Sequence, residues 1–243
     1  MLFHKKVSIV IPCRNEEVAL ASLLQKIPSY IDEVIVVDNK STDQTYKVAK
    51  SHGARVFIEN RTNGGIGYGF AHQTGLKKAT GDYIVAMDGD DTYPVHSIKK
   101  VISVMEKKNL DFVSCSRQPL KDQSAITPTR RMGIKILNLM IFLLYGFYFK
   151  DILTGMWVMN KKSASQLNLV SGDWDLSPEI KLAALTNKNL KFSEMHVPYF
   201  MRKGESKLNI WRTGFKHVLF IFRYRFNLVS KESIVVVGEA VTA

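Results

Sequence analysis

The segment YIVAMDGDDTYP, residues 83–94, begins as an apolar run and ends in three carboxylates, Asp88, Asp90 and Asp91. Carboxylates this close together repel one another, and each is costly to remove from water without a partner. Either solvent covers these side chains or a cation binds beside them. The other polar segments of the chain are needed to decide between the two.

Short apolar runs alternate with helical patterns through the first half of the chain. Strands are predicted at residues 7–12, 33–38, 54–59, 82–88 and 111–116. Continuous apolar strands between helices favour an α/β fold with a mostly parallel central sheet flanked by helices. In such sheets, ligands bind at the carboxyl ends of the strands.

The residues at the carboxyl ends of four of these strands are of kinds that bind ligands. They are Pro12, Arg14, Asn15 and Glu16 at the first strand, Asp38, Asn39, Ser41 and Asp43 at the second, Asp88, Gly89 and Asp90 at the fourth, and Ser116 and Arg117 at the fifth. At any single strand end a turn explains such residues, because Asp, Asn and Gly are common turn formers. Four polar ends on one edge of a sheet favour a binding site instead.

The net charge of +12 predicts an anionic partner. Nucleic acid, an acidic membrane surface and a phosphorylated substrate all fit this charge. The sequence has no recognised nucleic-acid motif, which disfavours a nucleic-acid-binding module. The two cysteines, Cys13 and Cys115, belong to no Cys/His cluster. We therefore expect no zinc site, and buried, reduced thiols in a cytosolic compartment.

Two common nucleotide-binding motifs are absent. The dinucleotide fingerprint GxGxxG follows the first strand of its domain, whereas the stretch NGGIGYGF (63–70) follows the third predicted strand. Phe70 also stands where the third glycine would be needed. The phosphate-binding pattern GxxxxGK[ST] does not occur. A dehydrogenase or kinase of the usual types is therefore disfavoured.

Four segments in this order resemble glycosyltransferase family 2, which has the A-type fold: VSIVIPCRNEE, VIVVDNKSTDQT, NGGIGYGFAHQTGLKKATGDYIVAMDGDD and RKGESKL. The resemblance runs from about Val7 to Leu208 and is greatest to the polyprenyl- and dolichol-phosphate sugar transferases, such as the dolichol-phosphate mannosyltransferases. Ile66 stands where many processive members have lysine, and their QxxRW motif is absent. Both differences favour the lipid-phosphate group.

The resemblance implies an inverting, metal-dependent enzyme that moves a hexose from a GDP- or UDP-linked sugar to a polyprenyl or dolichyl phosphate. Asp88 and Asp90 match the family's DxD motif and would hold Mg²⁺ or Mn²⁺ on the donor diphosphate, with Asp90 counted as catalytic. We expect Asp91 to face solvent or to lie at a helix end. The remaining donor-binding residues implied by the resemblance are Pro12, Arg14, Glu16, Asp38, Gly65 and Gly67.

Four basic residues match family positions that meet the acceptor phosphate: Arg117, Arg131, Arg202 and Lys207. Ser206 would add a hydroxyl to the same phosphate site. Lys203 is assigned to the solvated surface. Asp151, in KDILTG, matches a family aspartate near the reaction centre and is either a base, an acceptor-positioning group or the ion partner of a nearby arginine. Glu179 is a weaker catalytic candidate. An acceptor phosphate is largely an oxyanion near neutral pH, so it needs no general base, unlike a sugar hydroxyl.

Residues 133–149 (GIKILNLMIFLLYGFYF) would be about 25 Å long as a helix, short of the ~30 Å hydrocarbon core of a bilayer. This segment is either an amphipathic interfacial helix or a buried core helix. The aromatic, basic segment 211–226 offers a second surface for anionic lipid. No stretch has the ~20 apolar residues of a membrane span, and the N-terminus lacks a signal-peptide pattern. We therefore expect a peripheral protein on the cytoplasmic face of a membrane.

We expect one glycosyltransferase domain over residues 1–230. Residues 1–117 would form its nucleotide-sugar-binding half, and residues 118–230 its acceptor and membrane-facing half. The tail, residues 231–243, is an ordered segment, a spare strand or the remainder of a longer membrane-anchored protein. The oligomeric state is open. Two other functions fit the same fold: transfer to a saccharide or protein hydroxyl, and binding of a nucleotide sugar without catalysis.

Overall fold

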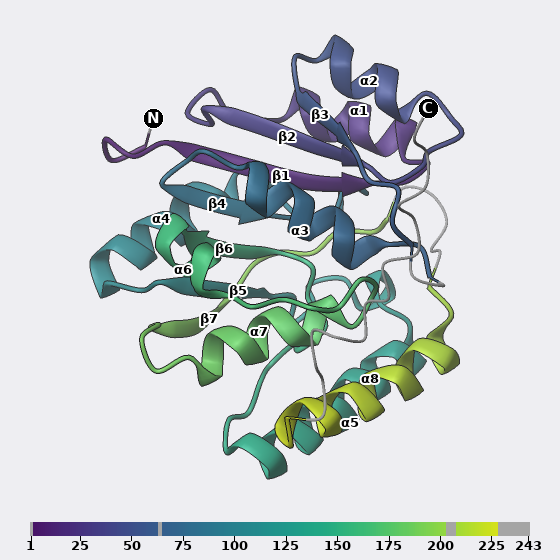
Figure 1. The fold of residues 1–243 in the computed structure, drawn as a ribbon, viewed down its shortest axis with the longest axis vertical. Coiled ribbons are helices and arrows are strands. Elements are labelled where there is room, and N and C mark those ends of the chain that lie inside the picture. Colours follow the sequence, from purple (N-terminus) through teal and green to yellow (C-terminus); the bar gives the residue numbers. More distant parts are fainter. Residues whose placement is uncertain (1, 63–64, 203–207, 228–243) are drawn as a thin grey trace, which may run out of the picture.

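The computed structural model describes residues 2–62, 65–202 and 208–227. A seven-stranded sheet crosses the molecule in the order β3-β2-β1-β4-β6-β5-β7, with helices on both faces (Figure 1). The strands are β1 (Val7–Cys13), β2 (Glu33–Asp38), β3 (Arg55–Ile58), β4 (Tyr83–Ala86), β5 (Phe112–Ser116), β6 (Trp157–Asn160) and β7 (Phe192–His196). The predicted α/β fold with a mostly parallel central sheet is confirmed.

Only β6 runs against its neighbours in this sheet. It lies between β4 and β5 and is antiparallel to both, with Val158 opposite Val85 on one side and Val113 on the other. The remaining pairs, β3–β2, β2–β1, β1–β4 and β5–β7, are parallel. Because β6 comes from the second half of the chain, both halves contribute to one sheet.

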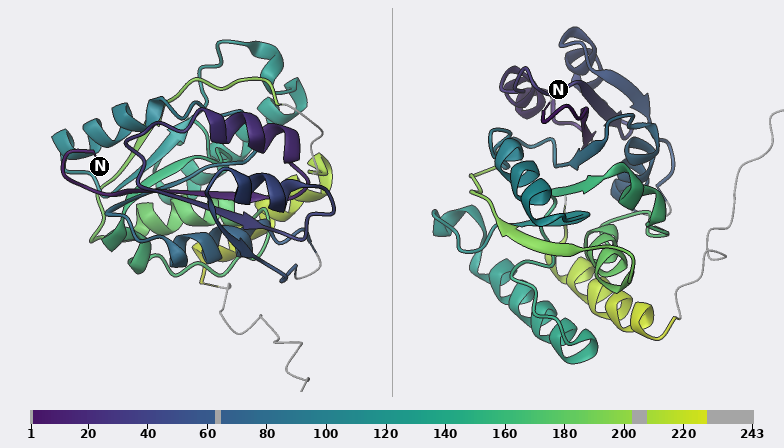
Figure 2. Two further views of the ribbon diagram at one scale, coloured as in Figure 1. Left: turned by 90° about the horizontal axis from the view of Figure 1, so that it is seen from above. Right: turned by 90° about the vertical axis from the view of Figure 1, so that its left-hand side faces the viewer.

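Helices pack against both faces of the sheet (Figure 2). The helices α1 (Glu17–Gln25), α2 (Thr45–Ser51) and α4 (Ser97–Lys108) cover one face, and α3 (Tyr68–Lys78), α6 (Lys161–Gln166) and α7 (Leu176–Thr186) cover the other. Side chains alternate along a strand, so Ile9 and Ile11 of β1 pack with the first group while Val10 packs with the second. Both faces of β1 are therefore buried, as its continuous apolar run predicts.

Two long helices, α5 (Pro128–Tyr145) and α8 (Ile210–Arg225), lie side by side at one end of the molecule (Figure 1). Their inner faces form a separate core that includes Leu137, Ile141 and Ile221. Their outer faces leave apolar side chains exposed, among them Leu143 at 74% and Trp211 at 81%. The helix α5 is thus amphipathic and not wholly buried.

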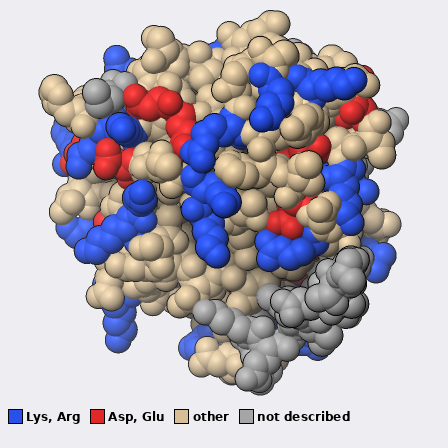
Figure 3. Space-filling model, turned by 45° about the horizontal axis from the view of Figure 1, so that its top comes forward, with Lys and Arg blue, Asp and Glu red and all other residues tan. Residues whose placement is uncertain are grey.

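The described residues contain no helix that is both long and apolar enough to cross a membrane. Positive charge is not gathered into one stripe on the face drawn in Figure 3, where Lys and Arg side chains are spread among uncharged residues. The interfacial role of α5 and α8 therefore stays a prediction at this point, supported by their exposed apolar faces.

Candidate active site

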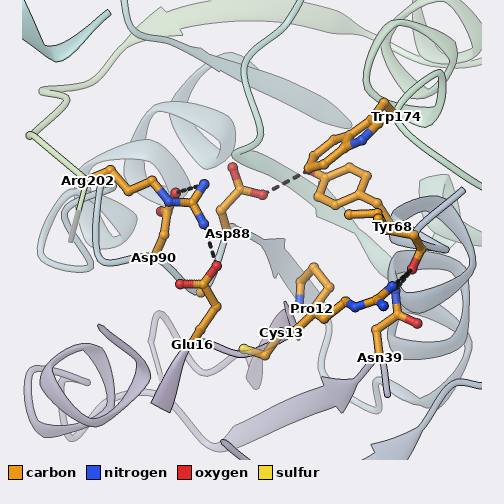
Figure 4. Close-up of a pocket in the computed structure, with 12 residues that line it drawn as sticks. Pro12, Cys13, Glu16, Asn39, Tyr68, Asp88, Asp90, Trp174 and Arg202 are labelled. Atoms are coloured by element: carbon orange, nitrogen blue, oxygen red, sulfur yellow. Dashed lines mark hydrogen bonds and ion pairs between the residues drawn. The ribbon is translucent and has the colours of Figure 1, made fainter. Parts of the chain in front are cut away.

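A cavity lies at the carboxyl ends of β1, β2 and β4 (Figure 4). Because these strands are parallel neighbours, the residues that follow them meet at one edge of the sheet. We call it the donor cavity, and its lining comprises Pro12, Cys13, Arg14, Glu16, Asn39, Ile66, Tyr68, Asp88, Gly89, Asp90, Trp174 and Arg202. Five predicted donor or metal residues, Pro12, Arg14, Glu16, Asp88 and Asp90, are thereby brought together.

Asp88 lies at the centre of this cavity and is held by its neighbours. The Tyr68 hydroxyl donates a hydrogen bond of 2.9 Å to Asp88 Oδ1. The backbone of Gly155 lies so close that an added Cβ would be 2.2 Å from Asp88 Oδ2. Burial and the neighbouring charge of Asp90 raise the pKa of Asp88 to about 7. The charges of Arg202 and Arg117 lower this pKa but do not outweigh the two causes that raise it, so the ionised form of Asp88 is only partly compensated.

Asp90 is better satisfied than Asp88. Its Oδ1 accepts a hydrogen bond of 2.7 Å from the Thr92 hydroxyl, and its Oδ2 lies 3.3 Å from Nη1 of Arg202. The other terminal nitrogen of Arg202 forms an ion pair with Glu16 (Figure 4). Arg202, which the sequence assigns to the acceptor phosphate, thus lies among the carboxylates of the donor cavity.

The donor cavity fits a divalent cation that arrives with its ligand. Asp88 and Asp90 supply hard oxygen ligands, and the raised pKa of Asp88 reports a carboxylate that a cation would stabilise. Across the described part of the chain, no three or more His, Cys, Asp or Glu side chains are grouped to hold a metal ion. The protein oxygens alone are too few for Mg²⁺ or Mn²⁺, so oxygens from a bound phosphate would have to complete the coordination.

Asp91 differs from its two neighbours, and the prediction for it is wrong. It is buried, and its Oδ2 accepts hydrogen bonds from the Ser22 hydroxyl at 2.8 Å and from Lys26 Nζ at 2.5 Å. The backbone of Asp91 has a φ of +61°, which turns its side chain out of the run of three carboxylates. Asp91 therefore ties α1 to this loop instead of facing solvent.

The glycine-rich loop permits close contact within the protein itself. Gly67 has a φ of +77°, and an added Cβ would lie 2.2 Å from the Arg61 carbonyl oxygen. An added Cβ on Gly65 would lie 1.8 Å from a carboxylate oxygen of Asp173. These contacts fix Ile66 between them at the cavity wall, where its carbonyl accepts hydrogen bonds from Asn39 and Arg14. Neither glycine lines the cavity, so their approach to a donor stays a prediction.

Asp38 lies just outside the lining. It is buried, and its Oδ1 accepts a hydrogen bond of 3.0 Å from the Ser41 backbone N–H. The next residue, Asn39, lines the cavity in its place. A hydrogen bond from Asp38 to a nucleoside base therefore also stays a prediction.

The sequence analysis missed the aromatic wall of the donor cavity. The rings of Tyr68 and Trp174 stack with centroids 4.6 Å apart and planes inclined by 25°. Trp174 comes from the loop before α7, far from the strand ends in the sequence. In the sequence, the position of Trp174 between Asp173 and Asp175, directly before a helix, could have indicated a binding residue. Tyr68 lay within the glycine-rich stretch already singled out.

A second cavity opens between α5, α8 and the end of β5. We call it the arginine–apolar cavity, and its lining comprises Arg117, Ile126, Thr129, Arg130, Gly133, Ile134, Leu137, Leu153, Tyr199, Leu208, Ile210, Thr213, Gly214 and His217. It combines two guanidinium groups with apolar side chains. Arg117 is present as expected, but Arg130 takes the place expected for Arg131. Successive helical residues point about 100° apart, so Arg131 lines a different depression.

Arg117 is fixed by Asp151. Its Nε and Nη2 donate hydrogen bonds of 2.6 and 2.8 Å to the two carboxylate oxygens, and Asp151 is fully buried. Burial would raise the pKa of Asp151, but the charge and hydrogen bonds of Arg117 outweigh it and hold this pKa below its usual value. Of the three roles considered for Asp151, these contacts favour the ion partner. A catalytic role for Asp151 stays a prediction.

Glu179, the weaker catalytic candidate, lines neither of the two cavities. The carboxylate of Glu179 accepts hydrogen bonds of 2.8 Å from the backbone N–H groups of Val170 and Ser171, which is a loop-holding contact. Ser206 and Lys207 lie outside the described residues. The acceptor roles of these two residues therefore stay predictions.

A hydrogen bond between His217 and Asp175 links the walls of the two cavities. Nδ1 of His217 lies 2.7 Å from Oδ1 of Asp175. His217 lines the arginine–apolar cavity, whereas the residue before Asp175 is Trp174, which lines the donor cavity. The helix α8 therefore contacts the loop that carries one wall of the donor cavity.

Sequence comparison defines the class of protein to which this fold and site belong. Residues 8–167 match the profile described as "Glycosyl transferase family 2". The chain belongs to glycosyltransferase family 2, as its motifs predict.

Three curated relatives are similar over most of this chain. The low-salt glycan biosynthesis hexosyltransferase Agl6 of Haloferax volcanii is 26% identical, over 88% of this chain and 52% of its own. The dolichyl-phosphate hexose transferase of the same organism is 29% identical, over 86% and 89%. The UDP-N-acetylglucosamine–dolichyl-phosphate N-acetylglucosaminyltransferase of Methanococcus voltae is 26% identical, over 87% and 93%. The chain thus spans about half the length of the first of these relatives.

The fold is also that of solved A-type glycosyltransferases. Glucosyl-3-phosphoglycerate synthase from Mycobacterium tuberculosis, solved with Mn²⁺, UDP-glucose and phosphoglyceric acid, superimposes with a TM-score of 0.72 at 19% identity. The match covers 92% of this chain and 80% of that one. At this identity the likeness establishes the architecture, and the ligands belong to the neighbour.

Proposed function

We propose that this protein is an inverting, metal-dependent glycosyltransferase that moves a hexose from a GDP- or UDP-linked sugar to a polyprenyl or dolichyl phosphate. The observation that carries the proposal is the pairing of an acidic cavity with a separate cavity that is both cationic and apolar. A lipid phosphate needs both properties at one site, whereas a sugar hydroxyl needs neither. The names of the relatives that act on dolichyl phosphate support the same acceptor.

On the donor side, Asp88 and Asp90 would hold the Mg²⁺ or Mn²⁺ ion. When bound, the cation supplies Lewis-acid stabilisation of the departing diphosphate. The Tyr68 hydroxyl orients Asp88 through its 2.9 Å hydrogen bond, and the stacked rings of Tyr68 and Trp174 shape the wall beside it. Both donors named among the relatives and neighbours described above are uridine diphosphate sugars, which supports testing UDP-sugars first.

On the acceptor side, Arg117 and Arg130 would bind the phosphate. The second pKa of a phosphate monoester is about 6, so near pH 7 its attacking oxygen is already mostly deprotonated. That oxygen forms a bond to the anomeric carbon while the bond to the diphosphate oxygen breaks and the nucleoside diphosphate leaves with the electron pair. Attack from the opposite face inverts the anomeric centre. Asp151 contributes by holding Arg117 in place.

The acceptor would reach this cavity from a membrane surface. The exposed apolar side chains of α5 and α8 lie next to the cavity, and basic residues such as Lys135, Arg212 and Lys216 accompany them. Amphipathic helices with this composition bind at the interface of anionic bilayers. We propose peripheral attachment to the cytoplasmic face.

The test is donor consumption by the purified full chain with Mn²⁺ and a panel of UDP- and GDP-sugars, with and without a short-chain polyprenyl phosphate. We expect nucleotide release that requires the lipid phosphate and that the Asp90→Asn variant loses. The Asp91→Asn variant is the matched control and should retain release, because Asp91 binds Lys26 outside the cavity. Nucleotide release with a soluble saccharide and without lipid would show that the acceptor is a saccharide. Donor binding without any nucleotide release would contradict the proposal that the protein is an enzyme.

A further inference from the structure

A third hollow lies on the other side of α5 from the arginine–apolar cavity. We call it the basic depression, and its cationic lining residues are Arg131, Lys135 and Lys150. None of the residues that line it is acidic. The amides of Gln118 and Gln123 and the side chain of Tyr148 complete its polar surface. The depression therefore has the composition of an anion site.

Two features bring the three cations together: helical spacing on α5 and the hydrogen bonds of Asn138. Arg131 and Lys135 are four residues apart on α5, so they lie on the same side of the helix. Asn138, one further turn along, is buried and binds the returning chain. Its side-chain amide donates a hydrogen bond of 3.0 Å to the Lys150 carbonyl oxygen and accepts a hydrogen bond of 3.2 Å from the Ile152 backbone N–H. These hydrogen bonds fix the backbone of Lys150 beside the helix.

The positive charge of this depression is not neutralised within the described residues. No ion pair there joins Arg131, Lys135 or Lys150 to a carboxylate, and Arg131 donates to the neutral amide of Gln123. The neighbouring acid is Glu194, whose carboxylate accepts hydrogen bonds of 2.7 and 3.3 Å from the backbone N–H groups of Lys150 and Asp151. That carboxylate is therefore directed at the main chain.

The rim of the basic depression is apolar. Met132 and Tyr148 line the depression together with the three cations and are 60% and 57% exposed. Ile136, the residue after Lys135 on α5, is 56% exposed. A small soluble anion would use the cations alone, whereas a phospholipid would place its headgroup on them and its acyl chains along the apolar rim. The rim continues onto the exposed face of α5 described above.

We infer that the basic depression binds the headgroup of an anionic phospholipid, at a site separate from that of the acceptor phosphate. The inference rests on the proposed function, which brings α5 to a membrane. Arg131 then serves membrane attachment, and Arg130, on the adjacent side of the helix, serves the acceptor. A neighbouring lipid held here would keep the opening of the arginine–apolar cavity at the bilayer surface.

The experiment measures binding of the full chain to sedimenting vesicles of phosphatidylcholine with and without phosphatidylglycerol. We compare the double variant Lys135→Gln/Lys150→Gln with the matched variant Lys107→Gln/Lys108→Gln, which removes the same charge from the exposed end of α4. The first should weaken binding to the anionic vesicles about thirtyfold, since each basic residue near the surface contributes about 1 kcal/mol. The second should weaken it by less than about threefold.

Three results would overturn the inference. Equal losses in the two variants would mean a diffuse electrostatic attraction without a site. Equal binding of the wild type to both kinds of vesicle would mean that the headgroup charge is not recognised. Binding of glycerol 1-phosphate in calorimetry with the same dependence on Lys135 and Lys150 would mean a soluble ligand in place of a lipid.

Transfer to a detergent-dispersed, short-chain polyprenyl phosphate separates this inference from the proposed function. We expect the Lys135→Gln/Lys150→Gln variant to keep wild-type turnover in detergent, because no vesicle surface is involved. A loss of turnover there would place the two lysines in the acceptor site and overturn the inference. A wild type that binds anionic vesicles as described but transfers no sugar in detergent would contradict the proposed function and leave the headgroup site standing.

Discussion

The donor cavity and the arginine–apolar cavity are built on different principles. The first gathers carboxylates from the ends of parallel strands, and the charges of Asp88 and Asp90 repel one another. The second gathers apolar side chains and Arg130 largely from α5 and α8, and Arg117 from the end of β5 is already balanced by the buried carboxylate of Asp151. The donor cavity therefore requires a ligand to complete its electrostatics. The arginine–apolar cavity is preorganised before any ligand binds.

The largest expected effect concerns the carboxylates that would bind the cation. Asp90→Asn should reduce sugar transfer by about a thousandfold, because it removes a ligand of the ion that stabilises the departing diphosphate. Mn²⁺ binding in the presence of UDP, followed by electron paramagnetic resonance, should weaken in parallel. Asp91→Asn is the control and should leave Mn²⁺ binding intact while lowering stability, since it breaks the contact with Lys26. Equal effects of both changes would contradict the distinction between these two carboxylates.

The second prediction tests whether the arginine–apolar cavity is preorganised. Asp151→Asn should lower the free energy of unfolding by about 3 kcal/mol, because it leaves the Arg117 charge without its buried partner. Urea denaturation measures this loss. The same variant should show a raised KM for the acceptor with a smaller change in kcat. A large fall in kcat at unchanged stability and acceptor KM would instead identify Asp151 as a general base.

The third prediction concerns the electrostatic cost of ionising Asp88 in the donor cavity, which makes the stability of the protein depend on pH. The pKa of Asp88 is raised from 3.8 to about 7 in the folded protein. Between these two values the folded state retains a proton that the unfolded state has released, so rising pH reduces the contribution of Asp88 to stability. Asp88→Asn should therefore be more stable than the wild type above pH ~7 and equal to it below pH ~4, with the difference growing as the pH rises between these two values.

This comparison requires urea denaturation at a series of pH values with a chelator present, so that no divalent cation compensates the carboxylates. Added Mn²⁺ and UDP should stabilise the wild type and not Asp88→Asn. Parallel stability curves for the two proteins across the whole pH range would show that Asp88 carries no electrostatic strain.

The smallest expected effect distinguishes the walls of the two cavities. Trp174→Ala should raise the KM for the donor about tenfold, because it removes the ring that stacks on Tyr68. The acceptor KM should stay close to that of the wild type. Trp211→Ala, at an exposed position on α8, is the matched control and should leave the donor KM unchanged. An equal change in both KM values would mean that the hydrogen bond of His217 with Asp175 transmits the loss from one cavity to the other.

Local sequence predicted most of the sheet but not its full order. The predicted strand 33–38 coincides with β2, because four consecutive β-branched residues, 34–37, lie between Glu33 and the turn that follows Asp38. The strand β6 is only four residues long, and its place between β4 and β5 depends on pairing partners distant in the chain. No local pattern encodes that choice.

The helix α5 begins at Pro128 and not at residue 133, because Thr127 caps it and proline occupies its first position.

The sequence by itself determined which side chains collect at the edge of the sheet. Parallel strands share one carboxyl edge, so the polar residues that follow β1, β2 and β4 meet there once those strands form. The tertiary structure decided how these residues pair. Arg202 reaches Glu16 across 186 positions of sequence, and Arg117 reaches Asp151 across 34.

The same division explains why Arg130 and not Arg131 lines the arginine–apolar cavity. The sequence places both on one helix, but only the packing of α5 against α8 selects the side that faces the cavity. Likewise, Trp174 lines the donor cavity because α7 and its preceding loop pack over α3, which carries Tyr68. Residue type and strand periodicity are local properties of the chain. The direction in which a helix faces is set by the apolar area it buries against distant elements.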